Sequence, residues 1–362
     1  TNVHHKCSLR QNTYGLSVRQ GEGVMSTMQA LVGGAGPDWE LRAIDVPSPR
    51  PGQLLVRVAA AGLNRADLYM LQGSYSPTAS ALRTFTGGLE LAGEVVAVGE
   101  GVTDHVVGAR VMGTTVGAFA TFALMDHRLA IPVPSSLSWT DAAVLPVALT
   151  TEHDALVTQA GFVAGQSVLV VGATSGIGMV AVQMAKALGA SIVIGTTTSE
   201  SKMVAVRGAG ADLVLNTSTR NPAQAVLEAT DGAGVDVVLD HVGGELFRQL
   251  PALTRVQGTI VNIGRLAGPA TTLDLDTVAF RRIRIQGTTF SVRTTEERAA
   301  VAAALLPGVL PAVAGGRIRP VVDAVIPFDR AQEAAERLRA NQVVGKLVLE
   351  IDPNPTGTGA TR

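Results

Sequence analysis

Cysteine is almost absent from this 362-residue sequence, and no uninterrupted apolar run reaches the length of a membrane span. The only cysteine, Cys7, excludes internal disulfides and any zinc site built from cysteines, and it is compatible with a reducing, cytoplasmic location. The apolar stretch 299–314 is interrupted by Pro307 and Pro311 and is shorter than the roughly 20 residues of a spanning helix. We therefore expect no membrane span.

An excess of charge of one sign is also missing. The 29 basic and 30 acidic residues are interspersed and give a formal net charge of −1. A protein with this charge distribution has no extended positive electrostatic potential that would bind nucleic acid or an anionic membrane. A small neutral or locally anionic ligand is therefore the expected partner. Residues 1–24 carry no apolar run of the signal-peptide type, and we expect them to be a disordered leader.

The length and the 40 glycines indicate two domains with many tight turns. Residues 28–132 read as short strands between glycine and proline turns, which predicts a compact, mostly β unit. A helical stretch follows near residue 139, with Ser138 as its expected N-cap and Asp141 at the third helical position.

From residue 167 to about 287, apolar strands alternate with amphipathic helices, which predicts a parallel sheet covered on both faces. The tail, 295–351, reads as two amphipathic helices and a last strand, "GKLVLEI". Because the tail cannot form a core alone, we expect it to pack back onto the first unit. The predicted fold is thus α/β, with a doubly wound (Rossmann) domain over 148–290 and a discontinuous β-rich domain over 25–147 and 291–362.

The stretch "VVGATSGIG", residues 170–178, has the features of a dinucleotide-binding turn. Its three glycines, Gly172, Gly176 and Gly178, follow a predicted strand and open a predicted helix, where the backbone can approach a pyrophosphate. Short-chain dehydrogenases use the same glycine spacing but need a Tyr-x-x-x-Lys pair downstream. All tyrosines here lie upstream, at 14, 69 and 75, so that interpretation fails.

Three further stretches resemble the zinc-independent quinone oxidoreductases of the medium-chain dehydrogenase/reductase superfamily: "AAGLNRADLYMLQGSY" (60–75), "GAGVDVVLDHVGGE" (232–245) and "NQVVGKLVLEI" (341–351). The resemblance runs from about residue 28 to 351. It implies that the β-rich domain is a GroES-like catalytic domain and that the protein acts as a homodimer. We place the candidate dimer edge at "RRIRIQGTTF", 281–290, because a strand there would end the sheet.

Zinc-containing members of the superfamily have their ligands at the positions that match Asn64, Leu89 and Val147, and none of these three side chains can take that role. Glu90 alone does not make a transition-metal site, and we interpret it as a structural acid near the cleft. Without a Lewis acid, hydride is expected to reach the carbon of an already electrophilic conjugated system, such as a quinone or an α,β-unsaturated carbonyl.

The resemblance also implies roles for single residues. Asn64 is expected at the nicotinamide end of the cleft, although it can equally serve to stabilise a turn. Tyr75 matches a tyrosine that mitochondrial-type enoyl reductases use at the substrate, where a phenol can donate a hydrogen bond or a proton to an enolate, with simple packing as the alternative. His153 and His241 are interpreted as packed or solvated side chains. The expected cofactor contacts are Asn64, Thr151, Gly172, Ser175, Gly176, Ile177, Gly178, Thr196, Lys202 and Gly264.

The stretch "IGTTTSESK" favours NADPH over NADH. An NAD enzyme needs a carboxylate directly after the second strand, and hydroxyl side chains stand there instead. Glu200 comes too late for that role, whereas Lys202 matches a lysine that binds the 2′-phosphate in the family. Thr217 departs from the family pattern, where a tyrosine often lies near the adenosine.

The sequence therefore predicts an NADPH-dependent, zinc-independent reductase of quinones or related conjugated carbonyls. Residues 111–134 and 178–190 also look like the enoyl reductase domains of polyketide synthases, which leaves an enoyl-thioester reductase as the alternative. A non-catalytic NADPH-binding protein is the third interpretation, because scaffolds of this kind can be reused.

Overall fold

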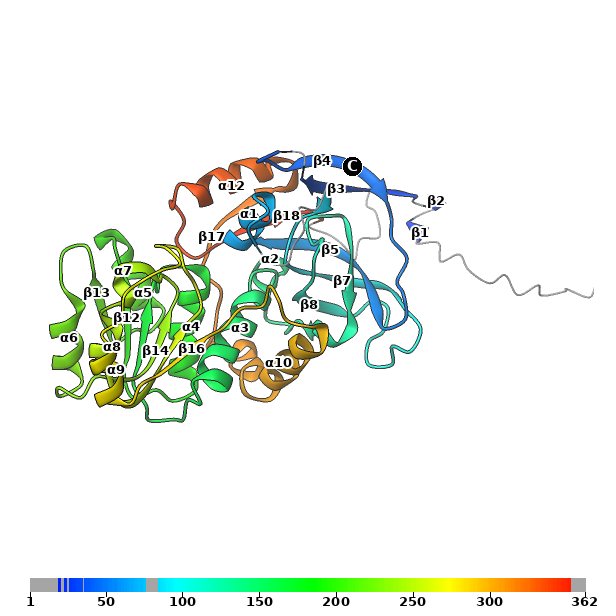
Figure 1. Cartoon of the computed structure of the whole chain (residues 1–362). Coiled ribbons are helices and arrows are strands. Elements are labelled where there is room, and N and C mark those ends of the chain that lie inside the picture. The colour runs from blue at the N-terminus through cyan, green and yellow to red at the C-terminus, as the bar shows by residue number, and fades with distance from the viewer. Residues whose placement is uncertain (1–18, 21–22, 25, 35, 76–83, 353–362) are drawn as a thin grey trace, which may run out of the picture.

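A computed structural model of the chain describes residues 19–20, 23–24, 26–34, 36–75 and 84–352. Most of the predicted leader and the last ten residues lie outside these ranges. Within the leader, two short strands, β1 (Arg19–Gln20) and β2 (Gly23–Val24), pair with each other. The remaining chain forms two domains that lie side by side in Figure 1.

The first domain is built on antiparallel strands. Three of them form one small sheet: β4 (Glu40–Asp45), β3 (Thr27–Gly33) and β6 (Phe85–Thr86). A larger sheet contains β5 (Gln53–Leu63), β7 (Glu90–Val98), β8 (Arg110–Thr114), β9 (Phe122–Asp126) and β10 (Ala130–Pro132). Helix α1 (Arg65–Leu71) follows β5, and the short 3₁₀ helix η1 (His127–Leu129) precedes β10.

The tail of the chain completes the larger sheet. Strand β18 (Lys346–Glu350) pairs antiparallel with β5, and β17 (Val322–Pro327) pairs parallel with β18. Three tail helices rather than the predicted two are present: α10 (Thr295–Gly308), α11 (Leu310–Ala314) and α12 (Ala331–Arg339), with a 3₁₀ turn, η4 (Phe328–Arg330). The extra helix arises because Pro311, whose missing N–H is harmless in a first turn, starts a new helix.

The second domain is a six-stranded parallel sheet in the order β13-β12-β11-β14-β15-β16. Its strands are β11 (Val168–Val171), β12 (Val193–Thr197), β13 (Leu213–Asn216), β14 (Val235–Asp240), β15 (Thr254–Asn262) and β16 (Arg284–Gly287). Its helical segments are α4 (Gly176–Ala187), η3 (Glu200–Lys202), α5 (Met203–Gly208), α6 (Pro222–Ala229), α7 (Gly244–Phe247), α8 (Leu250–Leu253) and α9 (Leu275–Arg281). Counted from β11, the order is the 3-2-1-4-5-6 of dinucleotide-binding folds. The predicted fold class is confirmed.

A helical connection joins the two domains. Helix α2 (Trp139–Ala142) begins as predicted, because the Ser138 hydroxyl accepts the backbone N–H of Asp141 at 3.1 Å. Helix α3 (Pro146–His153) continues into the π-helical turn η2 (Asp154–Gln159). One hydrophobic core includes residues of both domains, among them Ala60, Val168 and Val348. No described helix is long and apolar enough to cross a membrane.

Candidate active site

The glycine turn lies where the parallel sheet reverses its strand order, between β11 and β14. In such sheets the crevice beyond the carboxyl ends of the strands at this point is the usual ligand site. Gly172 directly follows β11 with a φ of +79°, a conformation that favours glycine. The Ser175 hydroxyl caps α4 by accepting the Gly178 N–H at 3.0 Å. The first turn of α4 is therefore ordered next to the switch point.

Two other predicted cofactor residues surround the same turn. The Thr196 hydroxyl, near the end of β12, accepts the Gly172 N–H at 3.1 Å. Gly264 follows β15, and a Cβ atom there would lie 2.3 Å from the carbonyl oxygen of His241. The structure thus brings the loops after β11, β14 and β15 and the end of β12 together at one edge of the sheet.

Lys202 lies in η3, beyond the end of β12, as the sequence suggested. Its Nζ atom donates to the carbonyl oxygens of Asn341 and Val343, each at 3.1 Å. Glu200 accepts from the side-chain amide of Asn216 at 3.3 Å. Lys202 therefore joins the nucleotide-binding domain to the segment that leads into β18.

Asn64 lies in the first domain, as the N-cap of α1. Its Oδ1 atom accepts from Nζ of Lys346 at 2.5 Å, and its Nδ2 atom donates to Oε1 of Glu90 at 2.9 Å. Lys346 also donates to Oε1 of Glu90, and the Val147 N–H donates to Oε2 of Glu90 at 2.9 Å. Glu90 is thus the acceptor at the centre of a buried polar cluster, which includes Lys346, a residue that sequence reasoning missed.

This cluster does not fit a zinc ion. Of the three former ligand positions, Asn64 holds an ammonium group and Val147 contributes only its backbone, while Leu89 is apolar. Within the part of the chain that the structure describes, no three His, Cys, Asp or Glu residues are grouped to hold a metal. A lysine at this point adds a positive charge, which opposes cation binding.

Two further ionisable groups lie near the cluster. Burial raises the pKa of Asp67 to about 7, although the Asn64 N–H, which it accepts at 2.7 Å, and the Lys346 charge both act to lower it. Half-buried Tyr75 precedes residues 76–83, which the structure does not describe. Burial raises the pKa of its phenol, opposed by the charge of Arg298 and reinforced by that of Asp67. Tyr75 therefore favours its protonated, hydrogen-bond-donating form.

A second buried pair lies under the glycine turn. Nε2 of His241 contacts Oε1 of Glu152 at 2.8 Å, and Nδ1 contacts the Val171 carbonyl at 2.8 Å. Burial acts to lower the pKa of His241, but the adjacent Glu152 carboxylate raises it overall. His241 is packed rather than solvated, which is one of the two alternatives expected from the sequence. Its two hydrogen bonds link α3 to the end of β11. The predicted nicotinamide contact, Thr151, is the half-buried neighbour of Glu152.

His153 fits the interpretation as a packed side chain. It is buried, its Nδ1 atom has no partner among the described residues, and burial lowers the pKa of its imidazole.

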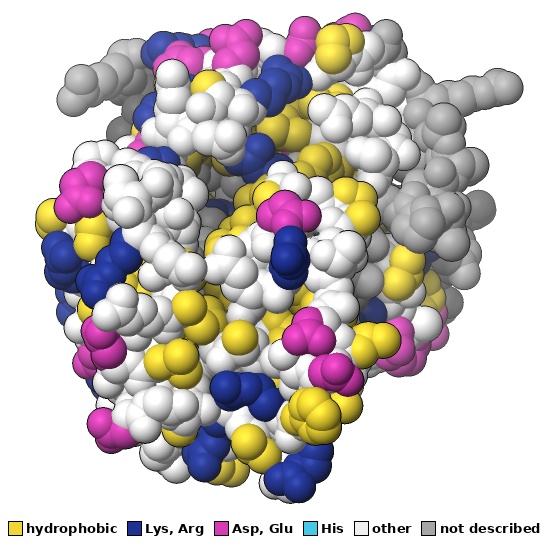
Figure 2. Space-filling model, turned by 60° about the vertical axis from the view of Figure 1, so that its left-hand side comes forward, with side chains coloured by type: hydrophobic (Ala, Val, Ile, Leu, Met, Phe, Trp, Pro, Cys, Tyr) yellow, Lys and Arg dark blue, Asp and Glu magenta, His cyan; other side chains and the backbone are white. Residues whose placement is uncertain are grey.

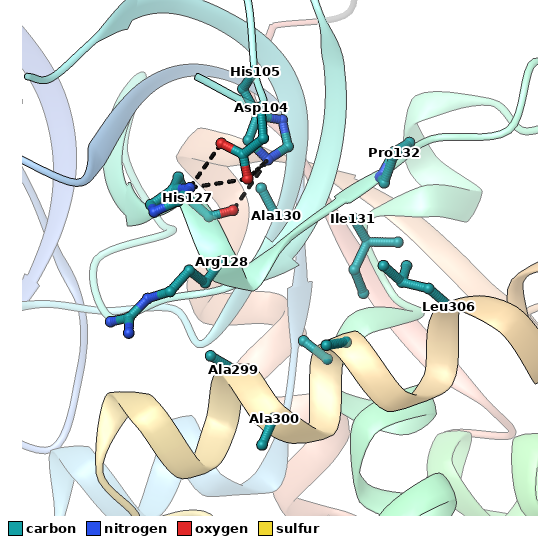
Figure 3. A pocket seen from close by; sticks show the side chains of 12 residues that line it. Asp104, His105, His127, Arg128, Ala130, Ile131, Pro132, Ala299, Ala300 and Leu306 are labelled. Carbon is teal, nitrogen blue, oxygen red and sulfur yellow. Dashed lines mark hydrogen bonds and ion pairs between the residues drawn. The ribbon is translucent and has the colours of Figure 1, made fainter. Parts of the chain in front are cut away.

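A separate pocket of about 510 Å³ lies in the first domain, between η1, β10 and α10 (Figure 3). Asp104 accepts from His127 at 2.8 Å at one end, and alanines of α10 form the opposite wall. None of the predicted site residues lines this pocket.

The glycine turn fits a dinucleotide. Glycines at 172, 176 and 178 give the turn its tight backbone, Ser175 orders the helix N-terminus, and Thr196 holds the turn against β12. A pyrophosphate bound there would be stabilised by the N–H groups and dipole of α4. The fold and the site define a two-domain protein of the dinucleotide-binding class.

The comparisons with known proteins agree with this class. Residues 50–135 match the alcohol dehydrogenase GroES-like domain, and residues 176–305 match the zinc-binding dehydrogenase family. A solved alcohol dehydrogenase superfamily protein from Novosphingobium aromaticivorans is 31% identical with a TM-score of 0.82, over 90% of this chain and 100% of that one. A mycobacterial protein solved in complex with NADPH is 31% identical with a TM-score of 0.76, over 90% and 100% of the chains. The chain therefore belongs to the medium-chain dehydrogenase/reductase family, in its quinone oxidoreductase type.

The curated relatives match over shorter segments. Erythronolide synthase EryA2 of Saccharopolyspora erythraea is 45% identical over 141 residues, which is 39% of this chain and 4% of that protein. Quinone oxidoreductase of Lama guanicoe is 36% identical over 140 residues, 38% of this chain and 42% of that protein. The matched part thus spans less than half the length of these relatives.

Proposed function

We propose that the protein reduces quinones or other α,β-unsaturated carbonyl compounds with NADPH and without zinc. The observation that carries this proposal is the Asn64–Glu90–Lys346 cluster, which offers hydrogen-bond donors and a positive charge where zinc-containing relatives hold a metal. When bound, the reduced nicotinamide supplies a hydride. The chain needs only to hold two flat molecules in contact and to stabilise the charge that forms on the substrate oxygen.

Each predicted site residue has a role in this proposal. Asn64 lies at the nicotinamide end of the site and acts through Lys346, because its Oδ1 and Nδ2 atoms already bond Lys346, Glu90 and the Gly62 carbonyl. Thr151 contacts the nicotinamide, and the protonated Tyr75 phenol donates a hydrogen bond to the reduced product. The turn from Gly172 to Gly178, with Thr196 and Gly264, holds the pyrophosphate and riboses. A homodimer in the reducing cytoplasm, the latter inferred from the single cysteine, is part of the same proposal.

The second candidate is an enoyl-thioester reductase, favoured by the 45% identity to the polyketide synthase segment. A large acyl carrier would favour a basic surface around the cleft. On the face shown in Figure 2, Lys and Arg side chains are interspersed with Asp and Glu around a hollow near the upper part of the molecule. This mixture supports a free small molecule more than a carrier-bound one.

The assay is NADPH oxidation with a panel of quinones, enones and crotonyl thioesters, with the zinc content of the same sample measured by elemental analysis. We expect turnover of quinones or enones by protein with less than stoichiometric zinc. Turnover of thioesters alone would support the second candidate, and NADPH binding without any turnover would support a non-catalytic role. A tightly bound zinc that activity requires would contradict the proposal.

Lys202 tests the choice of cofactor. An ammonium that pairs with the 2′-phosphate contributes roughly 1.5 to 3 kcal/mol, or about 10 to 100-fold in affinity. We expect Lys202→Ala to weaken NADPH binding by this factor and to leave NADH binding nearly unchanged. Lys186→Ala, which removes an exposed lysine paired with Asp212, is the control. Equal small losses for both cofactors would mean that the phosphate pocket lies elsewhere, and a wild-type preference for NADH would overturn the cofactor proposal.

A further inference from the structure

Lys346 is a buried cation with unused hydrogen-bonding capacity. Its side chain is 6% exposed, and its ammonium donates to Asn64 Oδ1 and Glu90 Oε1, each at 2.5 Å. An ammonium carries three N–H groups, so one donor has no partner among the described residues. Since a buried donor is rarely left unsatisfied, this third N–H is available for a ligand.

The carboxylate beside it is, by contrast, fully engaged. Glu90 is completely buried and accepts from Lys346, from Asn64 at 2.9 Å and from the Val147 N–H at 2.9 Å. The backbone leaves space for it, because a Cβ atom at Gly62 would lie 2.4 Å from Oε1 of Glu90. Glu90 thus fixes the lysine, while the free bonding capacity of the pair is on the ammonium.

The lysine stem also touches the cofactor turn. A Cβ atom at Gly176, the first residue of α4, would lie 2.2 Å from Cδ and 2.3 Å from Cγ of Lys346. The neighbouring Gly345 N–H donates to the carbonyl of Thr174 at 3.1 Å. Lys346 therefore extends from the glycine turn in the second domain to Asn64 in the first domain.

We propose that Lys346 is the catalytic cation of this enzyme, whose ammonium donates a hydrogen bond to the carbonyl oxygen of the substrate. This inference rests on the proposed reduction of a conjugated carbonyl. The electrophilic carbon gains a hydride with its electron pair from the reduced nicotinamide, which is oxidised. The π electrons move onto the carbonyl oxygen, whose negative charge the ammonium stabilises, and a proton from solvent completes the product. Glu90 and Asn64 are the positioning residues of this lysine.

The test compares Lys346→Met, Lys346→Arg and the double variant Lys346→Met/Glu90→Gln with wild type. The double variant avoids leaving an unpaired buried carboxylate, which would destabilise the fold. Lys186→Met is the matched control, because it removes an exposed lysine of α4. Each protein is measured for kcat, KM, NADPH dissociation constant by nicotinamide fluorescence, and melting temperature.

We expect kcat to fall about 100-fold in the Met variants, which is the usual effect of removing one hydrogen-bond donor from an oxyanion hole. The NADPH dissociation constant should change less than threefold. Lys346→Arg should recover part of kcat, since it keeps the charge. Unchanged kcat in a folded double variant would assign Lys346 a structural role. Unchanged kcat with tenfold weaker NADPH binding would place the ammonium on the cofactor phosphates, and either result overturns the proposal.

A second readout does not depend on turnover. 4-Nitrophenol, a flat phenol whose anion absorbs visible light, is titrated in the NADP⁺ complex of each protein. We expect the wild-type complex to bind the anion at least tenfold more tightly than the Lys346→Met complex. If wild type reduces no quinone or enone but shows this difference, the proposed function fails and the cation site stands. If reduction occurs and the anion binds equally to both proteins, the Lys346 proposal fails alone.

Discussion

At the scale of single residues, Asp67 makes the stability of the protein depend on pH. Burial raises its pKa from 3.8 to about 7, against the opposing effects of the Asn64 N–H and of Lys346. The folded state therefore binds this proton more tightly than the unfolded state. Its stabilising contribution is fully present below pH 4 and is lost as the pH rises through about 7.

We expect Asp67→Asn to flatten the pH dependence of the free energy of unfolding between pH 4 and 7, measured by urea denaturation. The shift corresponds to roughly 4 kcal/mol at the usual value per pKa unit. Asparagine can still accept the Asn64 N–H, so helix α1 should stay capped. Asp329→Asn, at an exposed position in η4, should leave the slope as in wild type. Parallel curves for wild type and Asp67→Asn would show that Asp67 is ionised in the folded state throughout this range.

At the scale of elements, the turn between β11 and α4 has little room for side chains. A Cβ atom at Gly178 would lie 2.6 Å from the Gly172 carbonyl oxygen and 2.9 Å from Cα of Ala173. Both neighbours are backbone atoms of the turn itself, so they cannot move away as a flexible side chain would. An added methyl group must displace the turn that is proposed to hold the pyrophosphate.

We therefore expect Gly178→Ala to weaken NADPH binding at least tenfold in a fluorescence titration. The matched change Gly208→Ala, at the end of α5, meets open space and should leave the dissociation constant within twofold of wild type. If both variants bind NADPH as wild type does, the cofactor does not depend on the geometry of this turn.

At the scale of the whole molecule, the sheet of the second domain ends in an exposed edge. All four residues of β16 are exposed, and the preceding helix α9 has no buried residue. Large apolar side chains lie there, with Phe280 80% and Leu275 74% exposed. An exposed edge strand with apolar neighbours favours pairing with a second copy of the same edge across a two-fold axis.

We expect light scattering at micromolar concentration to give twice the chain mass of 37.3 kDa. The double change Phe280→Asp/Ile285→Asp should produce monomers, because it places charges of the same sign on the apolar edge of both copies, where they repel each other, and removes the apolar contact area. Val204→Asp, at an exposed apolar position on α5, should remain dimeric. A monomeric wild type would contradict the proposed assembly.

The sequence by itself determined those features that depend on neighbouring residues. The strand–turn–helix context of Gly172, Gly176 and Gly178 and the Ser138 cap are local, since side-chain periodicity and turn chemistry extend over only a few residues. The fold class followed from the same periodicities. The number of tail helices did not, because a proline can end one helix or begin the next, and only packing selects between them.

Only the tertiary structure decided the polar clusters around the site. Lys346 and Asn64 are separated by 282 positions, and they meet because β18 returns to pair with β5. His241 and Glu152, 89 positions apart, meet because β14 lies beside β11 and His241, which directly follows β14, reaches Glu152 in α3. The sequence did offer one signal, a single lysine directly before three apolar residues of a strand. The partner of this lysine could not be inferred from the sequence. Contacts between distant segments depend on which strands pair in the folded chain, and local sequence patterns do not specify that pairing.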